Sequence, residues 1–127
     1  MELVPAGANK KSFSLFYHGG EIWCEHLDAL GRHTELLKQK FAEDLKIIKR
    51  PSTSSYVAIN MDQTEVSEEI LELIINSLCR LDRPLKKVVF IGLNSAMKRY
   101  IMKNTKTLNI LFLCTDDYEK AKEWLIP

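Results

Sequence analysis

Hydroxyl and carboxyl side chains gather in one short stretch of the sequence, Asp62 to Glu69, which reads DQTEVSEE. A serine or threonine hydroxyl can accept a phosphoryl group, and the helix dipole stabilises a carboxylate beside a helix N-terminus. The stretch follows an apolar run and precedes a helical pattern, a position where open α/β folds often place ligands and regulatory chemistry. Three interpretations stay open: a working site, the remnant of one, or only a helix start.

Other residues that could do chemistry are scattered along the chain. The histidines His18, His26 and His33, with Cys24 near the second of them, show no clean metal-ligand spacing. The sequence contains no GxSxG nucleophile elbow, no GxGxxG and no P-loop. We therefore expect no metal, no cofactor and no catalytic activity.

A second polar group begins at Asn94 and Ser95 and continues into the basic residues Lys98 and Arg99, with Tyr100 beside them. Basic and aromatic residues together on a helix are typical of a nucleic-acid face. The chain as a whole carries 18 Lys and Arg against 17 Asp and Glu, a formal charge of +1. This balance favours a solvated helix face, or a surface for an acidic protein, and we expect no nucleic-acid partner.

Composition bounds the class of protein. The chain has 127 residues, 46% of them apolar and 28% charged, as expected for one globular domain with one core. No apolar run approaches the length of a membrane span, and the N-terminus has no signal-peptide core. The three cysteines lack CxxC spacing, which indicates reduced and mostly buried thiols. We expect a cytoplasmic protein.

The pattern of apolar residues predicts nine elements after a flexible lead-in over residues 1–12. Gly19-Gly20 is expected to join two strands of a hairpin, and Thr34, Thr64, Asn94 and Asp116 are expected to cap the four helices. The predicted spans are a hairpin over 13–27, helices over 32–50, 65–81, 94–104 and 116–127, and strands over 55–60, 86–93 and 108–115.

The predicted order is β-β-α-β-α-β-α-β-α. Strict alternation after the hairpin implies mostly parallel pairing through right-handed crossovers. We predict an α/β fold with a mixed sheet of about five strands and four helices, formed as one domain over residues 13–127.

This order resembles that of the STAS domain, the fold of bacterial anti-sigma-factor antagonists. Four stretches are also similar to the family: LGRHTELLKQKFAEDL to its first helix, YVAINM to its central strand, VVFIGLNSAMKRYIMKN to its fourth strand and third helix, and LNILFLCTDDYEKAKEWL to its final strand and helix. The resemblance covers about residues 13–126.

In that family the turn after the central strand usually reads Asp-Ser-Ser/Thr-Gly, and a partner kinase phosphorylates its second hydroxyl, which switches binding off. The motif falls here on Val66, Ser67, Glu68 and Glu69, so the acid, the phosphorylated hydroxyl and the glycine are all replaced. Ser67 is retained, and either it or Thr64 is left as acceptor. The glutamates either stand in for the phosphate or only stabilise the helix start.

The resemblance implies a non-catalytic, regulatory protein-protein interaction module with a degenerate phosphorylation turn. Its partner would be a protein such as a kinase-like anti-sigma factor or another regulator, and a homodimer is compatible with this role. The alternative is a domain of the same fold that binds a small ligand, a nucleotide or a lipid, at the strand ends. The expected site residues are Asp62, Thr64, Ser67, Glu68 and Glu69 in the turn, with Asn94, Ser95, Lys98 and Arg99 as a secondary surface.

Overall fold

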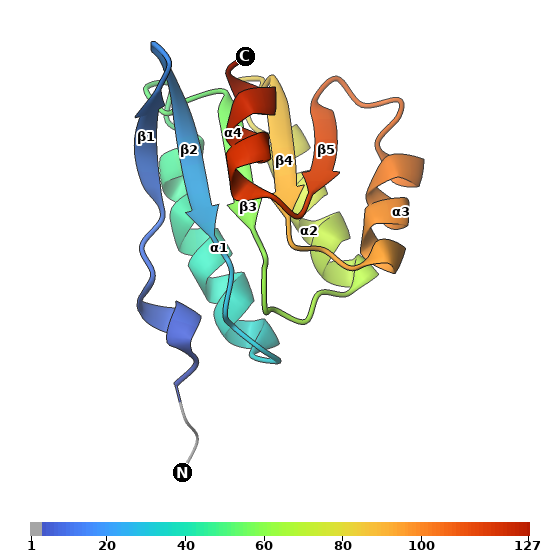
Figure 1. Ribbon diagram of the computed structural model, residues 1–127. Coiled ribbons are helices and arrows are strands. Elements are labelled where there is room, and N and C mark those ends of the chain that lie inside the picture. Colours follow the sequence, from blue (N-terminus) through green and yellow to red (C-terminus); the bar gives the residue numbers. More distant parts are fainter. Residues whose placement is uncertain (1–3) are drawn as a thin grey trace.

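A computed structural model describes residues 4–127, and its N-terminal part contains the hairpin that the sequence predicts (Figure 1). β1 (Phe13–Tyr17) pairs antiparallel with β2 (Gly20–His26). His18 and Gly19 form the turn with φ of 49° and 80°, the two positive values of a type I′ turn. The turn therefore uses His18-Gly19, and Gly20 is already the first residue of β2.

Strands and helices alternate after the hairpin, as predicted. Within residues 4–127 the fold is α/β, with a five-stranded mixed sheet and four α-helices in the order β-β-α-β-α-β-α-β-α. The strands lie side by side in chain order, and β2 to β5 are parallel neighbours. The remaining elements are α1 (Thr34–Ile48), β3 (Tyr56–Asn60), α2 (Glu68–Cys79), β4 (Lys87–Ile91), α3 (Ser95–Asn104), β5 (Leu111–Thr115) and α4 (Tyr118–Leu125).

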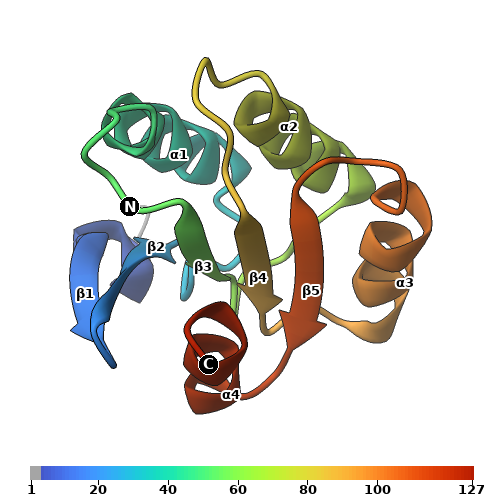
Figure 2. The same cartoon turned by 90° about the horizontal axis from the view of Figure 1, so that it is seen from above.

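The helices cover the two faces of the sheet unequally. Figure 2 shows α1 and α2 on one face, α4 on the other, and α3 beside β5. The larger apolar core lies under α1 and α2 and includes Phe41, Ile74 and Phe90, and the smaller one under α4 includes Val89 and Leu125. The strands β3 and β4 are buried on both faces, which explains their near-continuous apolar sequences.

Helix starts match the predicted caps in part. Asn94 caps α3 as predicted, because its side chain accepts a hydrogen bond from Met97 N. The prediction for α4 is wrong by one residue, since Asp117 and not Asp116 accepts the backbone N–H groups of the first turn. Thr34 is the first residue of α1 and makes no cap. These shifts arise because several adjacent residues had suitable side chains.

The segment before β1 lies against the loop after β2. Ala6–Asn9 form a short 3-10 helix, and Gly7 N donates to Ala29 O at 2.8 Å. A Cβ on Gly7 would overlap the carbonyl oxygen of Asp28, so only glycine fits this close approach. Residues 1–3 of the predicted flexible lead-in over 1–12 lie outside the described residues. The remainder is held against the loop after β2 through the contacts of Gly7.

The three cysteines differ in burial. Cys24 is buried and Cys114 half-buried, and burial raises the pKa of both thiols, that of Cys114 to about 11. Cys79 is exposed at the end of α2 and is the exception to the predicted, mostly buried thiols. In the part of the chain that the structure describes, no helix is both long enough and apolar enough to cross a bilayer.

Candidate functional site

The turn between β3 and α2 is tied to the loop between β2 and α1. Ala29 N donates to Asp62 O at 2.7 Å, Gly31 N to Gln63 O at 3.1 Å, and Glu65 N to Gly31 O at 2.8 Å. These bonds continue the parallel pairing of β2 and β3 beyond the ends of the strands. The turn that carries the predicted site residues is therefore held in place by its own backbone.

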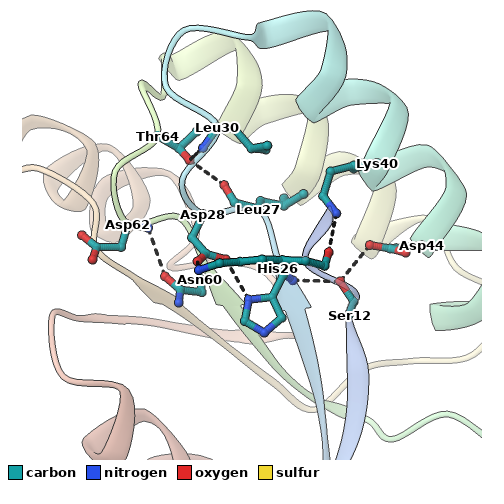
Figure 3. A network of polar contacts seen from close by, with 11 residues as sticks. Ser12, His26, Leu27, Asp28, Leu30, Lys40, Asp44, Asn60, Asp62 and Thr64 are labelled. Atoms are coloured by element: carbon teal, nitrogen blue, oxygen red, sulfur yellow. Dashed lines mark hydrogen bonds and ion pairs between the residues drawn. The ribbon is translucent and has the colours of Figure 1, made fainter. Parts of the chain in front are cut away.

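The Thr64 side chain fastens the same two segments. Its Oγ1 donates to Leu27 O at 2.7 Å and accepts from Leu30 N at 3.1 Å (Figure 3). The prediction that Thr64 caps the second helix is wrong, because α2 begins later and this hydroxyl bonds to the neighbouring loop instead. Both hydrogen-bonding roles of the hydroxyl are used, so Thr64 is a structural residue of the turn.

Backbone strain marks this region. Ala29 and Gln63 both have positive φ, 54° and 55°, which residues with a side chain rarely adopt. Gly92, at the end of β4, has a φ of 85°, and a Cβ there would lie 2.7 Å from the Asp62 Cα. The turn therefore fills the space beside the end of β4. Such conformations cost about 1–3 kcal/mol each and persist only where surrounding structure imposes them.

Ser67 caps α2 and stays exposed. Its Oγ accepts a hydrogen bond from Ile70 N at 3.2 Å. Ser67 lines a small hollow of about 250 Å³ between the turn and the start of α1, together with Arg32 and Glu65. Arg32 Nε lies 3.0 Å from Glu65 Oε2 in an exposed ion pair. A hydroxyl, a helix N-terminus and an arginine thus share one hollow.

The adjacent acids Glu68 and Glu69 point to different neighbours. Glu68 lines a hollow shared with α3, whereas Glu69 lines a hollow between α1 and α2 together with Lys38. Successive residues of a helix are turned by about 100° from each other, so two neighbours in sequence reach different grooves. The predicted acidic turn is therefore two separate surfaces.

The hollow between α2 and α3 has a volume of about 560 Å³ and joins the two predicted surfaces. Glu68 at the start of α2 and Arg99 on α3 both line it, and the other lining residues are Ala96, Tyr100, Lys103 and Asn104. Burial and the nearby Glu72 and Glu68 raise the pKa of the Tyr100 hydroxyl. We call this hollow the α2–α3 groove.

Of the secondary surface predicted from sequence, only Arg99 lines the α2–α3 groove. The Asn94 side chain is occupied as the cap of α3, and Ser95 is exposed beside it. Lys98 does not line the groove, and its Nζ lies 2.8 Å from Asp116 Oδ2 just before α4. The other α3 residues of the groove have the 3–4 residue spacing of one helix face, which was a usable signal in the sequence.

A buried polar network, which sequence reasoning missed, lies at the end of β2 (Figure 3). Asp28, only 4% exposed, has one carboxylate oxygen 2.7 Å from His26 Nδ1 and the other 2.6 Å from Lys10 Nζ. Burial alone would raise the pKa of Asp28, but the bonds from Lys10 and His26 outweigh it and lower that pKa. Nearby, Ser12 Oγ donates to the Asp44 carboxylate and accepts from His26 N.

Glu25, the residue before His26 on β2, lies in a different environment from Asp28. Its side chain is 1% exposed, one oxygen accepts from Trp23 Nε1 at 2.9 Å, and the other, Oε2, has no partner within the described residues. Burial and the nearby Asp44 raise the pKa of Glu25 to about 9, so the carboxyl is neutral at pH 7. The signal in the sequence was a glutamate that follows the apolar run Ile22–Cys24 within the strand.

The other residues considered for chemistry are dispersed. No group of three or more His, Cys, Asp or Glu side chains that could hold a metal ion occurs within residues 4–127. Of the histidines, His26 is bonded to Asp28 and stacks on Phe13, while His18 lies in the hairpin turn.

Comparisons with known proteins do not assign the chain to a family. No protein-family model matches the sequence, and neither a curated protein nor a solved structure matches it significantly.

Proposed function

We propose that the chain is a non-catalytic module that binds a regulatory partner protein through the turn at residues 62–69 and the α2–α3 groove. The observation that carries this proposal is the meeting of Glu68 from the turn and Arg99 from α3 along one groove. A hollow lined by opposite charges around a tyrosine suits a protein surface with its own mixed charges. The element order and the five-stranded sheet support a divergent STAS-like module.

The rigidity of the turn supports the same proposal. Positive φ values at Ala29 and Gln63 are unfavourable, and the two hydrogen bonds of the Thr64 hydroxyl hold the turn in that conformation. A surface fixed before binding loses little conformational entropy when a partner docks. The free thiols suit a reducing compartment, so we place this binding in the cytoplasm.

Ser67 is the hydroxyl that we propose as phosphoryl acceptor. It is exposed at the N-terminus of α2, whereas both hydrogen-bonding roles of the Thr64 hydroxyl are used. A phosphate on Ser67 would carry about −1.5 to −2 charge at a helix N-terminus, which favours negative charge. Arg32 lines the same hollow, and it would pair with the phosphate in place of its present ion-pair partner Glu65.

Partner capture tests the proposed surface. Purified protein is immobilised and incubated with lysate of the native cell, and bound proteins are quantified by mass spectrometry. The variant Arg99→Glu should lose the partner that the natural chain retains, because it gives the groove a second like charge beside Glu68. Glu43→Lys, an exposed change on α1 away from the groove, is the matched control.

Two results would count against the proposed surface. One is a partner retained equally by Arg99→Glu and the control. The other is a rise in melting temperature with a nucleotide or lipid and no captured protein, which would favour the small-ligand alternative. Mass spectrometry of protein from the native host shows which hydroxyl is phosphorylated. Phosphate found on Thr64 instead of Ser67 would refute Ser67 as the phosphoryl acceptor.

A further inference from the structure

The two edges of the sheet are protected differently. α3 lies beside β5, whereas none of the four α-helices of residues 4–127 lies beside β1 in either view (Figures 1 and 2). The sequence of β1, FSLFY, contains no charged residue and no proline, and its register with β2 is continuous without a bulge. Natural sheets usually protect an open edge with one of these features, so β1 is an edge free to pair.

The hydrogen-bonding direction along β1 follows from the hairpin turn. Tyr17 and Gly20 close a two-residue turn and form a hydrogen-bonded pair. Because such pairs alternate in an antiparallel ladder, the backbone groups of Ser14 and Phe16 point outward. The far end of β2 agrees: His26 N donates towards Ser12 beside β1, and the next residue, Leu27, donates to Asn60 O beside β3.

The side chains of β1 are apolar and partly uncovered. Phe16 is 82% exposed and Phe13 is 44% exposed, although both belong to a strand of the sheet. Leu15 and Tyr17 pack against the smaller core under α4, so the strand itself is firmly placed. An exposed phenylalanine next to unpaired backbone groups is typical of a surface that another strand covers.

We propose that β1 pairs antiparallel with β1 of a second copy of the chain, about a two-fold axis at Leu15, to form one continuous sheet through both copies. This register keeps all of Phe13–Tyr17 paired. Ser14 of each copy exchanges both backbone hydrogen bonds with Phe16 of the other, which uses the outward-pointing groups. Leu15 lies opposite Leu15 of the second copy as a pair without hydrogen bonds.

A second copy fits this edge better than an unrelated strand does. β1 is uncharged, so it attracts no charged strand and does not repel its own copy. In the two-fold register the small Ser14 faces the large Phe16, and Phe13 faces Tyr17 in an aromatic cross-strand pair. The two-fold pairing also closes the assembly, because it uses β1 of both copies and leaves β5 beside α3.

Proline at position 14 tests the proposal. Ser14→Pro removes an outward N–H that β2 does not use, so the hairpin stays intact and the second copy loses a donor. Sedimentation equilibrium from micromolar to submillimolar concentration should show a dimer for the natural chain and for Ser14→Ala. Dimerisation should be at least about tenfold weaker for Ser14→Pro, since the lost bonds leave polar groups unpaired.

A second variant and a folding control accompany this measurement. Phe16→Lys, at a side chain that contacts little within one copy, should also weaken the dimer by charge repulsion and lost apolar contact. Unchanged circular dichroism and melting of the dilute variants show that the fold is preserved. A natural chain that stays monomeric throughout the concentration range, or a dimer that both variants leave intact, would overturn the proposal.

A disulfide test reports the register itself. Leu15→Cys, in a Cys79→Ser background that removes the exposed thiol, should form a disulfide-linked dimer under mild oxidation. Facing residues of a pair without hydrogen bonds have Cα atoms about 4.5 Å apart, within disulfide range. Ser14→Cys is the matched control. In the proposed register Ser14 faces Phe16, so the two Ser14 residues lie two positions apart along the strands. Faster crosslinking by Ser14→Cys than by Leu15→Cys would refute the register.

Discussion

Two groups of acidic side chains in this molecule have opposite environments. Glu25 and Asp28 on and after β2 are almost completely buried, whereas Glu65, Glu68 and Glu69 around the start of α2 are exposed. The buried acids have shifted pKa values, Glu25 upward and Asp28 downward. The comparison shows that burial makes an acid decisive for stability, while exposure leaves it available for recognition.

The two buried acids differ from each other for an equally simple reason. Asp28 has the Lys10 ammonium and the His26 ring as hydrogen-bond partners, so its charged form is favoured. Glu25 is buried with an indole N–H on one oxygen and the Asp44 carboxyl nearby, so burial and Asp44 together favour its neutral form. Neighbouring groups therefore set the protonation state once water is excluded.

Glu25→Gln should have the largest effect on stability. The folded pKa of about 9 lies above the ordinary value of 4.5, so the stabilising contribution of the carboxyl is complete below pH 4.5 and is lost as pH rises to about 9. Within that window the free energy of unfolding falls by up to about 1.4 kcal/mol per pH unit. Glutamine stays neutral, so the variant should be more stable than the natural chain at pH 8.

Urea unfolding at a series of pH values measures this effect. The natural chain should lose stability between pH 5 and pH 9, with a flatter profile for Glu25→Gln. Glu21→Gln, on the same strand but only half-buried, is the control and should follow the natural profile. Parallel profiles for all three proteins would show that Glu25 is ionised in the folded state at neutral pH.

Asp28→Ala should destabilise the fold by about 2–3 kcal/mol, because it leaves Lys10 and His26 without their buried acceptor. The lowered pKa means that this contribution is present above the unfolded pKa of Asp28 and is lost as pH falls through the folded value. Denaturant unfolding at pH 7 measures the loss. Asp116→Asn removes an exposed ion pair to Lys98 and should cost less than about 1 kcal/mol; equal losses would contradict the role of burial.

Thr64→Val should cost about 2 kcal/mol, since valine keeps the shape but removes the bonds to Leu27 O and Leu30 N. Amide hydrogen exchange of Leu30 should also become faster, which a loss of global stability alone would not confine to this loop. Thr107→Val, at an exposed threonine after α3, serves as control. Unchanged exchange at Leu30 would argue against Thr64 as the residue that holds the turn.

Glu68→Gln with Glu69→Gln should have the smallest effect on stability, about 0.3–1 kcal/mol, because exposed charges at a helix N-terminus interact weakly with the dipole. The same double variant should nevertheless weaken partner capture, since Glu68 lines the α2–α3 groove. Thermal unfolding and capture from lysate measure the two effects. Unchanged capture would show that these glutamates only stabilise the first turn of α2.

Much of the fold could be predicted because its signals are local. Apolar runs such as YVAIN mark buried strands, and the apolar stripe with Leu37, Phe41 and Ile48 marks the inner face of α1. Helix caps were less predictable. Thr64 and Ser67 are both good caps by residue type, and only the long-range bonds of Thr64 to the loop after β2 leave Ser67 as the cap.

The candidate site was predictable only as a list of residues. The sequence identified Glu68 and Arg99 separately, but it could not show that they line one groove while Lys98 pairs with Asp116. The network around Asp28 joins Lys10 to a residue 18 positions later, and Ser12 to one 32 positions later. No periodicity within an element reports such contacts.

The sequence by itself determined the kind and order of the elements, because hydrophobic periodicity and turn chemistry act between near neighbours. It also determined that Ser67 and the glutamates stand at a helix start. Only the tertiary structure decided which acids are buried from solvent, which hydroxyl is fully hydrogen-bonded and which sheet edge stays open. These properties depend on burial and on partners distant in the chain, and packing sets both.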